Sequence, residues 1–101
     1  MKQNENEAVR MLFADIIKEA NLSDESLAAI SQVMDKKFTE ARQKRLDMID
    51  ALKDLYEKNL NKEPDEDFIL RERVCQGSID KYMTQMEVIC LWSEAKANIK
   101  K

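Results

Sequence analysis

Four carboxylates are the residues best spaced for chemistry: Asp47, Asp50, Asp54 and Glu57. Their spacing places them along one side of a helix. Carboxylate oxygens are the ligands that Mg²⁺ prefers, so this row could serve an all-α metal-dependent enzyme. Such a site needs further carboxylates from a facing helix, and the ones available there, Glu72, Asp80 and Glu87, are spread around the helix. We favour a solvated face partnered by Lys53 and Lys58.

Other reactive groups are scarce in this chain. It contains no histidine, the commonest general base and metal ligand. Cys75 and Cys90 would lie about 22 Å apart on a continuous helix, whereas a disulfide needs Cα atoms within about 7 Å. Both lie among apolar residues, which predicts reduced core thiols that react only after unfolding. We therefore expect no catalytic residue, no metal site and no cofactor.

The composition predicts the kind of protein that holds these groups. The chain has 101 residues and a mass of 11.8 kDa, enough for one small domain over residues 1–101. Charged residues make up 37%, and glycine and proline occur once each. Because helix formers dominate, the prediction is an all-α protein.

One long helix organises the prediction, running from Ser23 to Leu60 without an internal glycine or proline. Ser23 is a suitable N-cap, and Pro64 closes the turn that follows. The helix should be about 55 Å long at 1.5 Å per residue. A shorter helix, predicted for Glu5–Ala20, carries an apolar stripe and should pack antiparallel against it.

A third helix is predicted for Asp65–Asn98, with an apolar repeat in steps of four and three that is typical of a coiled coil or helical bundle. Gly77 could break it into two helices, which would give four in all; a continuous or kinked helix is favoured. The two long helices should form an antiparallel hairpin. The short helix should lie beside residues 24 to 42 and the C-terminal half of the third helix, completing a three-helix bundle at that end.

The far end of the hairpin is then left without cover. Two helices rarely bury many large side chains, and a sizeable exposed apolar patch usually marks an interface. The alternative is that a third helix broken at Gly77 folds over this patch. We expect Leu12→Glu to unfold the three-helix end, because Leu12 belongs to the buried stripe. The predicted partner-binding residues are Leu46, Ile49, Leu52, Leu55, Tyr56, Leu60, Phe68, Ile69 and Val74.

Charge and hydropathy limit the partners. The net charge is −3, which argues against nucleic acid as the main partner, and the basic stretch 36–45 is interpreted as a solvated face because acidic residues interrupt it. No segment has the roughly 20 apolar residues of a membrane span, and the N-terminus lacks the apolar run of a signal peptide. A cytoplasmic protein is expected.

Two short segments resemble known families. The run Leu46-Asp47-Met48-Ile49-Asp50 resembles the opening of the all-helical chorismate mutases, although Lys53 stands where that family has an apolar residue. The run Leu22-Ser23-Asp24-Glu25-Ser26 is similar to a motif of the Spy-type helical-hairpin chaperones, with Ser26 in place of their glutamine. The second resemblance implies a chaperone of the periplasm.

The sequence as a whole favours a binding protein over an enzyme. Our prediction is a small non-catalytic protein-interaction module, either a regulator, an adaptor or a secretion-type chaperone, acting through an apolar helical face. Its partner is expected to be a second copy, giving a homodimer, or a helix of another protein. The alternatives are the Spy-like periplasmic chaperone and the metal-dependent enzyme.

Overall fold

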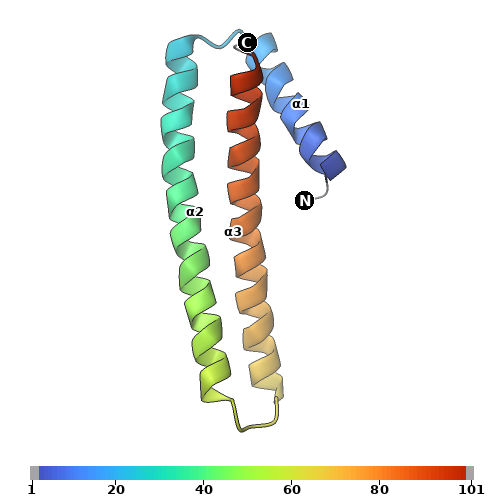
Figure 1. Ribbon diagram of the computed structural model, residues 1–101, viewed down its shortest axis with the longest axis vertical. Helices are drawn as coiled ribbons and strands as arrows, with labels where there is room; N and C mark the ends of the chain where they lie inside the picture. Colours follow the sequence, from blue (N-terminus) through green and yellow to red (C-terminus); the bar gives the residue numbers. More distant parts are fainter. Residues whose placement is uncertain (1–2, 100–101) are drawn as a thin grey trace.

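Three α-helices make up the protein, and the computed structural model describes them over residues 3–99 (Figure 1). They are α1 (Gln3–Glu19), α2 (Asp24–Lys58) and α3 (Glu66–Ile99). No strand occurs within these residues. The all-α prediction is confirmed, and each helix begins and ends within two residues of its predicted bounds.

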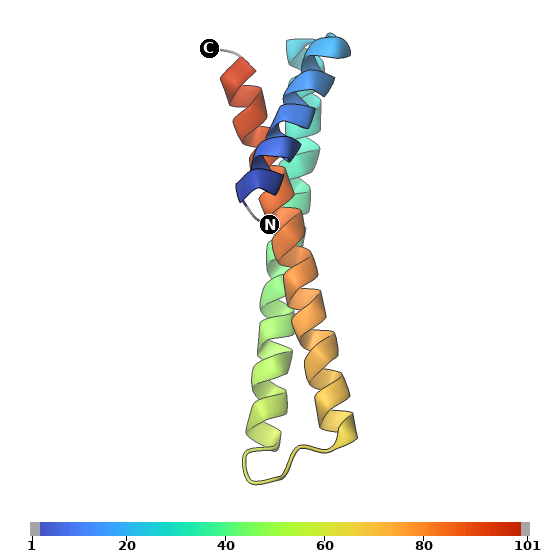
Figure 2. The same ribbon diagram turned by 90° about the vertical axis from the view of Figure 1, so that its right-hand side faces the viewer.

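The two long helices form an antiparallel hairpin that spans the 58 Å length of the molecule (Figures 1 and 2). Helix α3 runs through Gly77 without a break, so the alternative of four helices is wrong. The alternative in which a broken third helix folds over the far end is wrong for the same reason.

Local hydrogen bonds explain where the helices start and stop. The Ser23 side chain caps α2 by accepting a bond from the Ser26 backbone N–H at 3.1 Å. Asp65 caps α3 in the same way, accepting from the Phe68 N–H at 2.8 Å. Asn21 ends α1 with a positive φ of 51°, and the N–H of Leu22 bonds back to the Ile17 carbonyl, as in a Schellman motif. The bonds at Asn21, Leu22 and Ser23 fix the tight connection between α1 and α2.

The core lies at the end of the hairpin where α1 docks. Ile17, Leu27 and Trp92, one from each helix, form its buried centre. The rings of Trp92 and Phe13 meet edge to face with centroids 5.5 Å apart. Around this centre pack the partly buried side chains of Phe13, Leu22, Ile30, Met34 and Ile99.

Helix α1 packs against α3 and not alongside α2, which corrects the predicted arrangement. No Cα atom of α1 lies within 8 Å of a Cα atom of α2. Because the backbone of α1 runs beside that of α3 alone, part of the apolar stripe of α1 faces solvent, and Leu12 is 57% exposed. The burial predicted for Leu12 is therefore wrong, and Leu12→Glu is expected to leave this end folded.

Gly77 offers a direct test of the continuous third helix. Its φ is not positive, and a Cβ atom added there would meet nothing within 4 Å. Gly77→Ala should therefore raise the free energy of unfolding by about 0.5 to 1 kcal/mol, because alanine loses less backbone entropy in a helix. Chemical denaturation measures the change. Ala28→Gly on the exposed face of α2 should have the opposite effect, and a destabilising Gly77→Ala would contradict a regular helix at this position.

Candidate interaction surface

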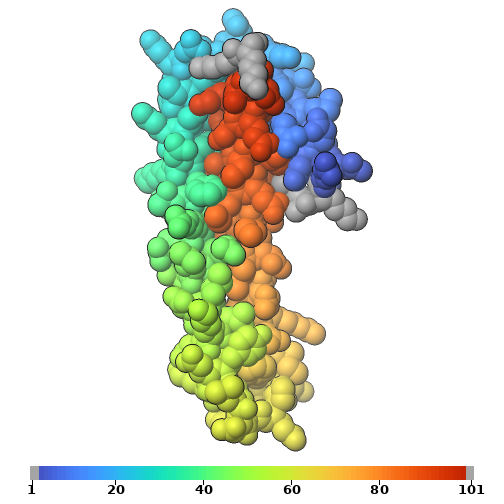
Figure 3. Space-filling view, viewed as in Figure 1, coloured from blue at the N-terminus to red at the C-terminus, as the bar shows by residue number. Residues whose placement is uncertain are grey.

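Helix α1 covers only one end of the hairpin. Figure 3 shows it against the upper part of the molecule, while the lower part is formed by α2 and α3 alone. We call this lower part the distal half and define it as residues 46–76. Seven apolar residues are buried among residues 3–99, and none of them belongs to the distal half: Ile17, Leu27, Ala41, Ile89, Leu91, Trp92 and Ala95.

Large apolar side chains of the distal half remain exposed. Among the nine predicted partner-binding residues, Leu60 is 76% exposed and Val74 is 59% exposed, and Leu46, Tyr56 and Ile69 are also exposed. The other four are half-buried: Ile49, Leu52, Leu55 and Phe68. A partner could therefore reach the first five without opening the hairpin.

One side of the distal half is hollowed into a groove of about 570 Å³, which we call the distal groove. Its apolar lining comes from Leu55, Leu70 and Val74, with Cys75 and Ala51 beside them. Leu70 is 61% exposed and was not among the predicted residues. It lies in the apolar run Phe68-Ile69-Leu70, and its place outside the four-and-three repeat was the available signal for an outward-facing side chain.

Four charged residues line the same groove, two from each helix. On α2, Lys58 Nζ lies 2.9 Å from Asp54 Oδ2; on α3, Arg71 Nε lies 2.9 Å from Asp67 Oδ2. The exposed fractions of these four side chains are between 59% and 72%. Exposed pairs one helical turn apart contribute only about 0.3 to 0.5 kcal/mol each, so these charges can change partners at little cost.

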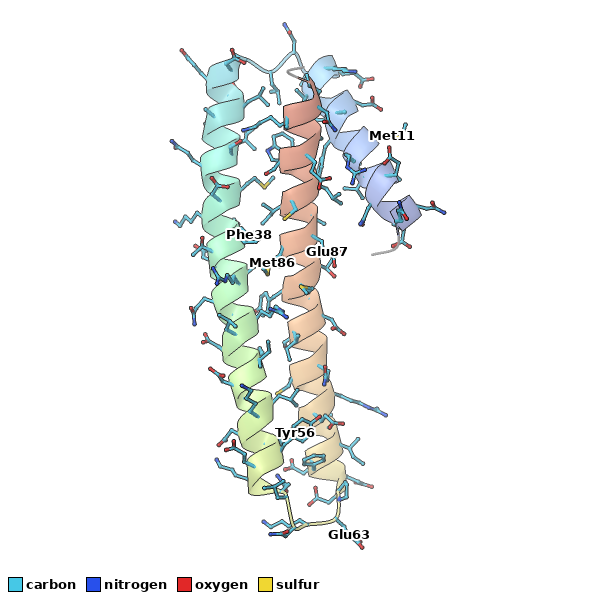
Figure 4. All side chains as sticks on the ribbon, in the orientation of Figure 1. Met11, Phe38, Tyr56, Glu63, Met86 and Glu87 are labelled. Carbon is cyan, nitrogen blue, oxygen red and sulfur yellow. The ribbon has the colours of Figure 1, made fainter. Side chains whose placement is uncertain are left out.

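An aromatic pair joins the two helices near the turn. The ring centroids of Tyr56 and Phe68 lie 6.0 Å apart. The Tyr56 hydroxyl donates a 2.6 Å hydrogen bond to Glu72 Oε2 (Figure 4 labels Tyr56). This bond raises the pKa of Tyr56 above its usual value, because the Glu72 carboxylate accepts from the neutral hydroxyl and repels the phenolate. The contacts fix the register between α2 and α3.

The acidic row of α2 is exposed along its whole length at Asp47, Asp50, Asp54 and Glu57. Asp47 accepts a hydrogen bond from Gln43 Nε2 at 2.9 Å, and Asp54 pairs with Lys58. Within residues 3–99, no three His, Cys, Asp or Glu side chains come together as metal ligands would. The absence of catalysis and of a cofactor stays a prediction.

The two cysteines differ from their prediction. Cys75 is half-buried beside the distal groove, and Cys90 is exposed. Cys90 lines a second groove, of about 310 Å³, together with Phe38 and Met86, which lie near the middle of the hairpin (Figure 4). Because a reagent can reach Cys90 in the folded protein, the prediction that both thiols are protected is wrong for this residue.

Comparison with protein-family models, with curated proteins and with solved structures finds no match. Among the described residues, no helix combines the length and apolar character that crossing a membrane requires.

Proposed function

We propose that this chain is a small protein-interaction module without catalytic activity, which acts through its distal half and associates with a second copy of itself. The observation that carries the proposal is the exposed apolar lining of the distal groove, which α1 leaves uncovered. A regulator, an adaptor or a secretion-type chaperone needs such a surface and no reacting group.

The energetics favour pairing of two copies. Burying a leucine side chain is worth about 1.5 to 3 kcal/mol, so the several apolar residues of two distal halves can offset the entropy lost on association. A two-fold contact buries the same patch on both copies and is the commonest closed arrangement of identical chains.

The mass in solution tests the proposal. Sedimentation of the wild-type protein over a concentration series should give a mass approaching twice the 11.8 kDa of the single chain at high concentration, and the mass should fall toward that of the single chain on dilution. A single-chain mass at every concentration would contradict self-association.

The metal-dependent alternative predicts that Mg²⁺ raises the melting temperature of the wild-type protein and that this effect is lost in Asp50→Asn. We expect no Mg²⁺ effect on the melting temperature of either protein.

A further inference from the structure

The four charges of the distal groove alternate in sign. Tyr56 contacts both Phe68 and Glu72, so it stands level with about residue 70 on the other helix. In this register Lys58 stands level with Asp67, and Asp54 stands level with Arg71, each to within about one residue. Near the turn the cation is on α2 and the anion is on α3. One helical turn farther from it, the anion is on α2 and the cation is on α3.

Each helix therefore carries one anion and one cation, one turn apart, on the groove side. Reversing the direction of such a helix exchanges the two positions. A helix laid antiparallel on its own copy then places each cation opposite an anion. The apolar residues Leu55, Leu70 and Val74 lie in the same groove and would meet their copies there.

We propose that a second copy of this chain occupies the distal groove with its hairpin antiparallel to the first, related by a two-fold axis perpendicular to the helices. Lys58 then faces Asp54 of the partner subunit, and Arg71 faces Asp67 of the partner subunit. This arrangement rests on the self-association proposed above and adds its geometry. The two α1 ends point in opposite directions, so only the distal halves overlap.

The parallel two-fold arrangement would lay α2 on the partner's α3, so that Lys58 faces Asp67 of the partner subunit and Asp54 faces Arg71 of the partner subunit. It would also bring the two α1 ends together, whereas the antiparallel arrangement overlaps only the distal halves, where the uncovered apolar side chains lie. The two arrangements differ in which charges meet, so charge reversals distinguish them, while the apolar side chains supply most of the affinity.

Two single charge reversals on α2 test the arrangement. Lys58→Glu alone places a glutamate opposite an aspartate, and Asp54→Lys alone places two lysines opposite each other. Each variant should self-associate about tenfold more weakly than the wild type at low ionic strength, or weaker still. An equimolar mixture should recover the wild-type dissociation constant to within about threefold, because each reversed charge then faces its complement. Sedimentation equilibrium measures the dissociation constants of the two variants and of their mixture.

The design separates the possible failures. Lys37→Glu makes the same charge change on α2 at a site that is 62% exposed and outside the groove, and it should associate as the wild type does. A wild-type monomer would contradict the proposed function itself. A wild-type dimer that neither reversal weakens would overturn the charge pairing alone. Reversals that weaken the dimer without recovery in the mixture would overturn the antiparallel arrangement, since a parallel dimer leaves half of those contacts mismatched.

Discussion

Replacing Trp92 with alanine should lower the free energy of unfolding by about 3 to 5 kcal/mol, the cost typical of removing a large aromatic side chain from a core. Trp92 is 4% exposed and lies in the small cluster that joins the three helices. Its loss also removes the edge-to-face contact with Phe13. The free energy of unfolding of a natural domain is roughly 5 to 15 kcal/mol. The variant should therefore be close to unfolding. Thermal melts followed by circular dichroism measure the effect.

Trp92→Phe is the matched control. Within residues 3–99, no hydrogen-bond acceptor reaches the Trp92 indole nitrogen, so phenylalanine keeps an aromatic ring and gives up no side-chain bond. Trp92→Phe should lower the free energy of unfolding by less than half as much as Trp92→Ala does. Equal losses of the free energy of unfolding in the two variants would contradict the expectation that a phenylalanine ring keeps part of the packing of Trp92.

Replacing Leu70 with glutamate should convert the dimer into a folded monomer. Leu70 is 61% exposed in the groove, so a charged side chain can be accommodated in the single chain. In the dimer the substitution removes two buried leucines and brings in two charges. The loss of about 3 kcal/mol or more corresponds to a dissociation constant raised roughly 100-fold. Sedimentation gives the mass, and circular dichroism tests whether the helices persist.

Leu12→Glu is the control for exposure and chemistry. Leu12 is 57% exposed on α1, outside the distal half, and the same substitution there should change neither mass nor helix content. A Leu70→Glu protein that remains dimeric would remove the distal groove from the interface. A Leu70→Glu protein that unfolds would mean that Leu70 belongs to the core of the hairpin.

The helices themselves could be predicted because their signals are local. Ser23 marks the start of α2 by a hydrogen bond within one turn, and Asp65 does the same for α3. Gly77 was ambiguous because a glycine lowers helix propensity without forbidding a helix, and packing along the hairpin decides the outcome. The end of α1 at Asn21 could also be predicted from the sequence, since asparagine tolerates the positive φ of a Schellman motif.

The docking of α1 could not be predicted in the same way. A periodic stripe predicts which face of a helix is apolar, but it does not fix which neighbour that face meets. Since the backbone of α1 runs beside that of α3 alone, Leu12 and Ile16 of the stripe remain exposed. Cys90 was misplaced for a related reason, because its apolar neighbours in sequence, Ile89 and Leu91, point to other sides of α3.

Some features of the distal half could be predicted from the sequence, and others could not. The absence of cover over the distal half followed from helix lengths, since α1 is too short to reach it. The groove required the pairing of two helices, and so Leu70 and the alternating charges of Asp54, Lys58, Asp67 and Arg71 became visible only in three dimensions. Side chains between the helices, such as Leu52, belong to the hairpin seam more than to its surface.

Chemical cross-linking at position 70 tests self-association through the distal groove most directly. The proposed two-fold axis passes within about one residue of Leu70, so a cysteine there lies next to its copy. In a background with Cys75→Ser and Cys90→Ser, Leu70→Cys should be joined into a covalent dimer by a short bifunctional thiol reagent. Leu12→Cys, similarly exposed on α1, should remain monomeric under the same conditions. Equal yields at the two positions, or a dimer at position 12 alone, would contradict association through the distal groove.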